Sequence, residues 1–243
     1  MFVRIGDYAR AREISYGVGD YIRRYIELFH DDQDDVLHDN IAWFYKELNS
    51  CVQALFNADN TNDAILCMEI MAEIGEAWGM HSPFAARENL LLTLKNIGDI
   101  YFLVKTDYSS ALERYIKLLD LCKEFNCIEE SVQYDQTSQI CEMLGMTYVR
   151  CIDCYVLMEK ELEAIEFAKV SKKSIAALAE FLPELKNQAA YLVLAVGSQI
   201  EWTYPSVVRI FAEYALELAE SATTDIEENK AYAIKAMQIL ENL

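Results

Sequence analysis

The sequence predicts an all-α protein, and three observations carry this prediction. Glycine and proline are scarce, with 8 and 3 among 243 residues, while apolar residues make up 53% of the chain. Apolar residues recur with helical spacing, and no long run alternates as a half-buried strand would. Short turns with capping residues separate the helical stretches. Together these features favour helices packed in series around a sizeable core.

About ten helices are expected, and turns mark where several of them begin. Turns with capping residues or an early proline occur at residues 60–63, 82–83, 106–107, 182–183 and 204–205. The expected helices cover residues 7–29, 34–57, 63–79, 84–104, 107–125, 130–158, 161–181, 184–203, 206–221 and 226–241. Because short connections make neighbouring helices antiparallel, we expect four hairpins in series with one further helix at each end.

One pattern of large residues and glycine recurs in three of the expected helices. It reads Leu94-x2-Ile97-Gly98-x2-Tyr101, Cys141-x2-Leu144-Gly145-x2-Tyr148 and Val193-x2-Val196-Gly197-x2-Ile200. On a helix the large residues form a stripe, and the glycine leaves a notch beside it. Glycine costs up to about 1 kcal/mol in a helix interior, so the notches indicate close approach of another helix. A fourth match, around Gly75, falls on a helix expected to be the second of its hairpin, and we interpret it as coincidence.

This pattern resembles that of the tetratricopeptide-repeat (TPR) superfamily, whose hairpins carry W-x2-L-G-x2-Y and then A-x3-F. The best match continues from Gly98 to Ala111 and Tyr115, and the second continues from Gly145 to Ala164. The glycine intervals of 47 and 52 residues (98 to 145 and 145 to 197) exceed the family's repeat of about 34, so the hairpins are enlarged. The resemblance implies a right-handed α-solenoid in one continuous domain. Residues 1–33 would form an N-terminal helix and acidic loop, residues 34–221 the hairpins, and residues 222–243 a capping helix.

The chain is strongly acidic, with a net charge of −19 from 40 acidic and 21 basic residues. Its average field would repel nucleic acid and anionic membranes, so we expect direct contact with neither. No stretch approaches the roughly 20 apolar residues of a membrane span, and the first residues lack the apolar core of a signal peptide. A cytoplasmic location is therefore expected. The acidity serves either solubility or the recognition of a basic partner.

The sequence shows no convincing metal, redox or catalytic motif. Its seven cysteines lie in apolar helical patterns or at a helix end, as reduced core residues do. Cys151 and Cys154 form a CxxC motif, but mid-helix, away from a helix N-terminus that would lower a thiol pKa. The acidic run at residues 30–39 lacks the glycine and glutamate of an EF-hand. Glu27-x2-His30 alone is too little for a di-iron site. We expect no cofactor, no metal and no catalysis.

The TPR resemblance places a partner-binding groove across the first helix of each hairpin. Counting from each glycine gives the candidate groove residues Lys95, Asp99, Phe102, Glu142, Arg150, Tyr191, Glu201 and Trp202. Some TPR proteins bind a C-terminal carboxylate with Lys and Asn, but Asp99 replaces that Asn here and should pair with Lys95 at i, i+4. We therefore expect a protein or peptide partner of basic or amphipathic character.

Three consecutive aromatic residues, Trp43, Phe44 and Tyr45, lie on one expected helix. They must point about 100° apart, so at least one ring should face outward. The N-terminal helices are therefore candidates for a homodimer or partner contact. The leading interpretation of the chain is a non-catalytic scaffold or adaptor. One alternative is an acidic decoy that occupies a basic nucleic-acid-binding protein, and a third interpretation is a metal-dependent helical enzyme.

Overall fold

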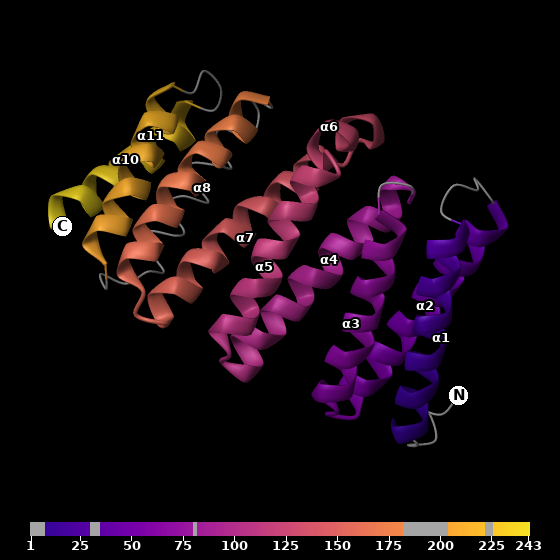
Figure 1. Cartoon of the computed structure of the whole chain (residues 1–243). Helices are drawn as coiled ribbons and strands as arrows, with labels where there is room; N and C mark the ends of the chain where they lie inside the picture. Colours follow the sequence, from indigo (N-terminus) through magenta and orange to yellow (C-terminus); the bar gives the residue numbers. More distant parts are fainter. Residues whose placement is uncertain (1–7, 30–34, 80–81, 182–203, 222–225) are drawn as a thin grey trace. The chain divides into compact units, whose positions relative to one another are not determined.

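The computed structural model describes residues 8–29, 35–79, 82–181, 204–221 and 226–243. Every regular element in these ranges is helical, which confirms the predicted all-α class (Figure 1). The α-helices are α1 (Tyr8–Phe29), α2 (Asp35–Asn57), α3 (Thr61–Trp78), α4 (Phe84–Ile100), α5 (Tyr108–Glu124), α6 (Cys127–Ser131), α7 (Thr137–Leu157), α8 (Glu161–Phe181), α10 (Pro205–Ser221) and α11 (Ile226–Asn242). A π-helical turn, η3 (Tyr101–Lys105), follows α4, and a 3₁₀ turn, η4 (Val132–Tyr134), follows α6.

The chain divides into two compact units. Unit 1 comprises Met1–Thr106 and Asp120–Glu130, and unit 2 comprises Asp107–Leu119 and Ser131–Leu243. Each unit therefore includes part of α5 and has its own packed helices. The three-part division of the chain expected from the sequence stays a prediction.

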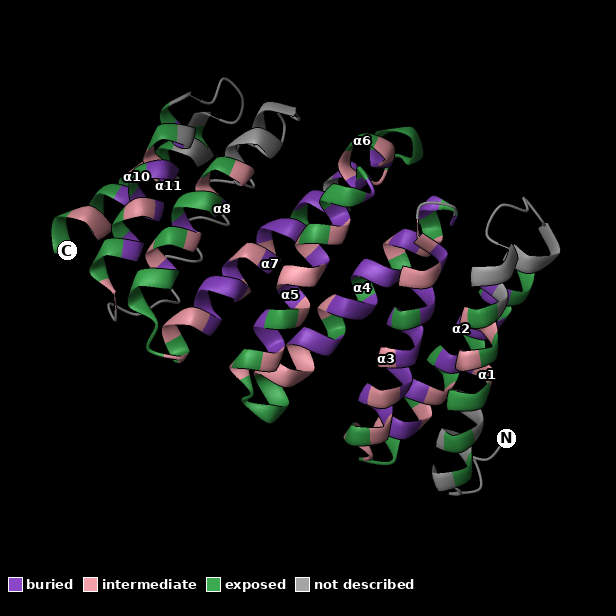
Figure 2. Ribbon diagram, in the orientation of Figure 1, coloured by how far each residue is buried: buried purple, intermediate pink, exposed green. Residues whose placement is uncertain are grey.

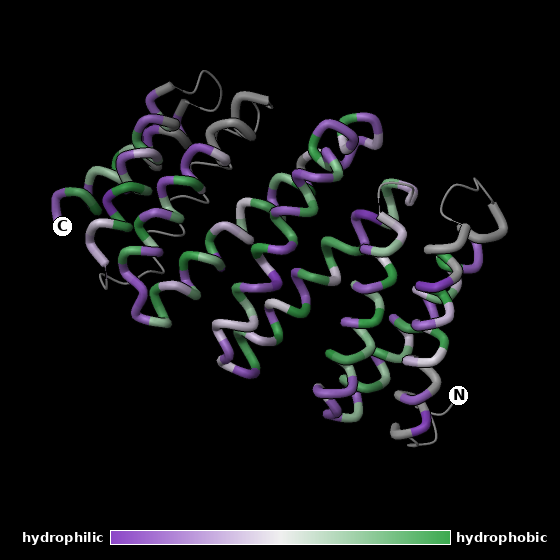
Figure 3. Tube along the Cα trace, viewed as in Figure 1, coloured by the Kyte–Doolittle hydropathy of each residue, from purple (hydrophilic) through white to green (hydrophobic). Residues whose placement is uncertain are grey.

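The helix α3 is the centre of unit 1 and packs against α1, α2 and α4. Apolar residues recur along it (Figure 3), and so do buried positions (Figure 2). Its buried residues are Ala64, Ile65, Cys67, Met68, Ile70, Met71, Ala72, Ile74, Gly75 and Trp78. A helix with a wide buried face must be covered by several neighbours, which is the role of the three surrounding helices.

Gly75 lies where α2 and α4 both approach α3. A Cβ atom added at Gly75 would lie 2.5 Å from the hydroxyl oxygen of Tyr45 and 3.1 Å from the Cβ of Leu90. The Tyr45 hydroxyl donates a 2.5 Å hydrogen bond to the Met71 carbonyl, one turn earlier on α3. Gly75 therefore has a packing role between α2 and α4, and the interpretation of its match to the repeated pattern as coincidence stays a prediction. The missing side chain is what leaves room for Tyr45 and Leu90.

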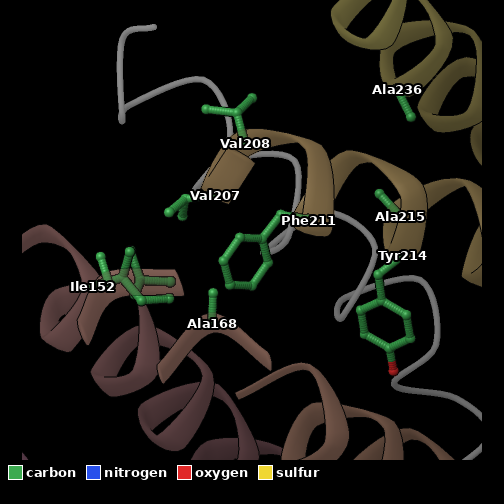
Figure 4. Close-up of a cluster of buried hydrophobic side chains, with 10 residues drawn as sticks. Ile152, Ala168, Val207, Val208, Phe211, Tyr214, Ala215 and Ala236 are labelled. Atoms are coloured by element: carbon green, nitrogen blue, oxygen red, sulfur yellow. The ribbon is translucent and has the colours of Figure 1, made fainter. Parts of the chain in front are cut away.

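In unit 2, α7, α8, α10 and α11 pack in chain order. Their shared core centres on Phe211 of α10, which is fully buried. Figure 4 shows its ring pointing toward Ile152 of α7 and Ala168 of α8, with Val207 beside it. The small side chain of Ala168 leaves space for the ring, so α8 and α10 can approach closely.

Two of the expected helices are divided in the structure. The stretch expected as one helix over 130–158 consists of α6, η4 and α7, and Asp135 between them has a φ of 54°. Aspartate tolerates this left-handed conformation better than most residues do, so it ends the helix. Val132 and Tyr134 suggested a continuous apolar pattern, yet both are exposed. Similarly, the helix expected over 84–104 becomes π-helical at Tyr101.

Several expected helix starts are confirmed. The Asn60 side chain accepts a hydrogen bond from the Asp63 N–H at the start of α3, and Asp107 accepts one from the Ser110 N–H at the start of α5. The helix α10 begins at Pro205, as the early proline predicts. The helix expected over 184–203, with the Gly197 notch, lies outside the described residues.

The cysteines lie in the interior, as expected for structural thiols. Six are buried and Cys51 is half-buried, and none of the seven, all of which lie in the described ranges, forms a disulfide. Burial raises the pKa of both thiols in the CxxC motif, and that of Cys154 reaches about 12. A thiol with such a pKa is almost entirely protonated at neutral pH, so this motif is poorly suited to nucleophilic chemistry. Across the described ranges, no helix has the length and apolar character to span a bilayer.

Candidate binding groove

A groove in unit 1 runs between α2 and α4, with residues of α3 between them. It consists of two hollows of about 620 and 310 Å³ that share Asn49, Met71, Thr93 and Asn96 in their linings. We call the two hollows together the α2–α4 groove. The larger hollow is within the usual size range of ligand-binding clefts, roughly 300–1,000 Å³.

Three helices supply different chemistry to the α2–α4 groove. The helix α3 contributes the apolar side chains of Met68, Met71 and Trp78. The helices α2 and α4 contribute four exposed side-chain amides, which are those of Asn49, Gln53, Asn89 and Asn96. The two amides on α2 are four residues apart and those on α4 are seven apart, so each pair lies on one face of its helix. The groove therefore has an apolar floor between two amide-bearing walls.

The four side-chain amides are available to a ligand. Among the residues that the structure describes, none of these amides forms a hydrogen bond with the protein. Each amide offers two N–H donors and a carbonyl acceptor. On α4, Thr93 lies between Asn89 and Asn96 in the sequence. Its hydroxyl donates a 2.7 Å hydrogen bond to the Asn89 backbone carbonyl, so the Thr93 hydroxyl oxygen can still accept a hydrogen bond. The walls therefore present donors and acceptors in similar numbers.

The α2–α4 groove does not share the strong negative charge of the chain. Asp39 and Lys46, both on α2, carry opposite charges. Asp99 lines the smaller hollow, but its carboxylate lies 2.6 Å from the Lys95 ammonium. This ion pair confirms the i, i+4 pairing predicted from the sequence. Opposite charges in close contact cancel at longer range, so the groove is close to neutral.

The sequence-predicted groove residues are distributed over both units. In unit 1, Asp99 lines the groove, Lys95 pairs with it, and Phe102 is half-buried on η3. In unit 2, Glu142 is exposed on α7, and Arg150 is half-buried further along the same helix. The remaining candidates, Tyr191, Glu201 and Trp202, lie outside the described residues. The structure thus brings Lys95 and Asp99 together, and the other candidates stay predictions.

Arg150 has a partner within its own helix. Its guanidinium lies 3.3 Å from the carboxylate of Asp153, which is buried on α7. Burial penalises the ionised carboxylate more than Arg150 favours it, so the pKa of Asp153 rises from its ordinary value of 3.8 to about 6. Arg150 is therefore committed to neutralising a buried acid, and this limits its use as a partner-binding cation.

This buried carboxyl predicts a pH-dependent loss of stability. The folded chain holds the Asp153 proton up to about pH 6, whereas the unfolded chain releases it near pH 3.8. The folded state therefore binds more protons in this window, and stability falls as the pH rises through it, by roughly 3 kcal/mol in total. Asp153→Asn should abolish this contribution. Urea unfolding at several pH values across the window measures this. The free energy of unfolding of the variant, relative to that of the wild type, should increase as the pH rises. A difference that stays constant with pH would contradict the assignment.

The prediction that at least one of the three consecutive aromatic rings of α2 faces outward is confirmed. Trp43 is 62% exposed, while Phe44 and Tyr45 are buried. On the preceding helix, α1, Arg23 forms ion pairs with Asp20 of the same helix and with Glu73 of α3, and Arg24 forms one with Asp20. These two arginines therefore already have acidic partners within unit 1. A homodimer through the N-terminal helices stays a prediction, with Tyr21 on α1 and Trp43 on α2 as its exposed aromatic candidates.

The amide walls were not expected from the sequence. The TPR resemblance concerns positions counted from Gly98, Gly145 and Gly197, and of these three glycines only Gly98 lies in unit 1. A signal was nevertheless present, because Asn49 and Gln53 share a helix face, as do Asn89 and Asn96. Polar amides on a helix face are common on solvated surfaces, so their spacing alone does not identify a groove.

A scan of the sequence against known protein families finds no match, and a search of curated proteins finds no relative. Within the described part of the chain, no three His, Cys, Asp or Glu side chains gather as a metal site would require. Residues 30–34, which are half of the acidic run at residues 30–39, lie outside that part. The α2–α4 groove is therefore the candidate functional site of the described chain.

Proposed function

We propose that this chain is a non-catalytic, TPR-like helical-repeat scaffold that binds an extended, amphipathic peptide segment of a protein partner in the α2–α4 groove. The single observation that carries the proposal is the set of four amides on the two walls, at Asn49, Gln53, Asn89 and Asn96, which have no hydrogen-bond partner within the described part of the chain.

An extended peptide matches the chemistry of this groove. Its backbone presents N–H donors and carbonyl acceptors alternately, and a side-chain amide can satisfy both kinds of group. Successive side chains of an extended segment point to opposite sides, so alternate residues would face the apolar floor of Met68, Met71 and Trp78. The near-neutral lining does not require a charged ligand. The amphipathic form of the expected partner is therefore the better supported one.

The repeat-scaffold part of the proposal is supported by the way helices pack within each unit. Short connections join α2 to α3 and α7 to α8, and the helices α1 to α4 in unit 1 and α7, α8, α10 and α11 in unit 2 pack on helices close to them in the chain. Packing of this kind is expected of a repeat array, in which each hairpin buries its apolar face against the next. A right-handed solenoid in the cytoplasm, with the TPR-like hairpins over residues 34–221, is the architecture that we propose.

Removal of the wall amides should weaken peptide binding without unfolding the protein. The test begins with a library of random short peptides selected on the full-length chain, followed by titration of the best peptide. The double variant Asn49→Ala/Asn96→Ala should bind that peptide about tenfold or more weakly, since two lost hydrogen bonds cost about 1.4 kcal/mol or more. Both residues are exposed, so the melting temperature should hardly change.

The matched control is Asn40→Ala, which removes an exposed amide from the same helix but outside both hollows. It should bind the peptide as the wild type does. Equal binding by all three proteins would place the peptide elsewhere and contradict the groove assignment. Failure of the library to yield any binder would contradict the peptide-binding function.

A further inference from the structure

Two charged residues, Asp39 and Lys46, are among the described residues that line the larger hollow of the α2–α4 groove. They are seven residues apart on α2, so they lie on one face of the helix and about 10.5 Å apart along its axis. Both residues are exposed, and within the described ranges no ion pair or hydrogen bond occupies the Asp39 carboxylate or the Lys46 ammonium. The larger hollow therefore has one negative and one positive position, separated by two helical turns.

Small side chains open the hollow between these two charges. Ala42 lies between them on the same face of α2, and Ala85 and Ala86 line the opposite wall on α4. The floor includes the buried Trp78, and Leu92 of α4 is 40% exposed in the lining although its side chain is large and apolar. A bulky apolar side chain of a ligand would fill the space beside the alanines and cover Leu92, which removes apolar surface from water.

We propose that the larger hollow recognises a peptide motif in which one bulky apolar residue lies between a basic residue and an acidic residue. This inference rests on the proposed peptide-binding function and specifies the partner. The basic residue pairs with Asp39, the acidic residue pairs with Lys46, and the apolar residue fills the space beside Ala42. Such a motif has no net charge, which matches the near-neutral lining of the groove.

The spacing of the motif follows from the geometry of an extended chain. Every second side chain of an extended segment faces the same side, so the three motif residues are two positions apart and span about 13 Å. This span slightly exceeds the rise between Asp39 and Lys46, and the long, flexible lysine side chain covers the difference. Side-chain amides such as those of Asn49 and Asn89 both donate and accept, so the segment can run in either direction. The combination of charges therefore decides binding, whichever of the two comes first in the peptide.

Three synthetic peptides with identical neutral flanks test this motif on the full-length protein. Their central sequences are Lys-Thr-Trp-Thr-Glu (the mixed peptide), Glu-Thr-Trp-Thr-Glu (the acidic peptide) and Lys-Thr-Trp-Thr-Lys (the basic peptide). Binding is measured by fluorescence anisotropy at about 150 mM salt, which screens the average field of the acidic chain beyond about 8 Å. The mixed peptide should bind about three- to tenfold more tightly than either of the others, because each of those exchanges one attraction for a repulsion.

Charge variants should change the order of the three peptides in opposite directions. With Asp39→Lys the acidic peptide should bind most tightly, and with Lys46→Asp the basic peptide should do so. The matched control is Glu47→Lys, which makes the same charge change as Asp39→Lys at an exposed residue of α2 outside both hollows. This control should still bind the mixed peptide most tightly.

A size variant tests the apolar position of the motif. Ala42→Leu places a larger side chain in the hollow and should weaken binding of the mixed peptide about fivefold or more. The same peptide with alanine in place of tryptophan should bind the wild type about tenfold more weakly than the mixed peptide does. It should lose little further affinity for Ala42→Leu. Equal losses for the two peptides would contradict the assignment of the bulky residue to this hollow.

An unchanged order of the three peptides in Asp39→Lys and Lys46→Asp would overturn the proposed motif, as would failure of the mixed peptide to bind. The variant Asn49→Ala/Asn96→Ala distinguishes this result from failure of the proposed function. If it weakens binding of the library-selected peptide while the charge variants leave the order unchanged, the groove binds peptides and only the motif is wrong. If it affects neither that peptide nor the mixed peptide, the assignment of peptide binding to the groove is itself wrong.

Discussion

Replacement of Gly75 with alanine is expected to destabilise unit 1 by about 1–3 kcal/mol. The new Cβ would lie 2.5 Å from the Tyr45 hydroxyl oxygen and 3.1 Å from two atoms of Leu90. Tyr45 cannot simply rotate away, because its ring is buried and its hydroxyl is bonded to the Met71 carbonyl. The strain should therefore move α2 or α4 away from α3. Urea unfolding followed by circular dichroism measures the loss.

Two further variants make this expectation specific. Gly17→Ala is the matched control, because no atom lies within 4 Å of the added Cβ and alanine is the better helix former. It should leave stability unchanged or raise it by up to about 1 kcal/mol. Tyr45→Phe removes the nearest atom, so Gly75→Ala should cost less in that background than in the wild type. Equal costs in the two backgrounds would show that the Tyr45 contact does not limit the packing.

Replacement of Phe211 with alanine is expected to destabilise unit 2 by about 3–5 kcal/mol. The ring is fully buried between α7, α8 and α10, and its removal leaves a cavity among Ile152, Ala168 and Val207. Alanine and valine side chains cannot extend to fill a space of that size, so little of the loss is recovered. Amide hydrogen exchange read by mass spectrometry should show faster exchange in α7, α8, α10 and α11.

The control for this variant is Leu162→Ala on α8, where the side chain is 77% exposed. Its effect should stay within about 0.5 kcal/mol, because surface truncations remove little buried area. A similar cost for Leu162→Ala and Phe211→Ala would mean that the cluster around Phe211 is not the core of unit 2.

The helical class and most helix starts could be predicted because they depend on local chemistry. Asn60 and Asp107 cap helices through bonds to residues three positions away, and Pro205 is tolerated only at a first turn. The break at Asp135 could not be predicted with equal ease. In the sequence, Val132 and Tyr134 continue the apolar pattern, and only the folded structure shows that both are exposed.

Gly75 shows what local patterns miss. Its reason lies in Tyr45 and Leu90, which come from two other helices, so tertiary packing decides whether the glycine is needed. The amide walls likewise depend on tertiary packing. Asn49 and Asn96 are 47 residues apart in the chain (49 to 96), and they line one groove only in the folded structure. Sequence spacing located the ion pair of Lys95 and Asp99 because both residues are on one helix.

The division of the α2–α4 groove into an apolar floor and amide walls has an evolutionary consequence. Met71 and Tyr45 line the groove but also pack the interior of unit 1, so few substitutions there leave the fold intact. Asn49, Gln53, Asn89 and Asn96 are exposed and can be exchanged at little cost in stability. A lineage that keeps the floor can therefore alter the walls freely, and its members would recognise different partners on one unchanged scaffold.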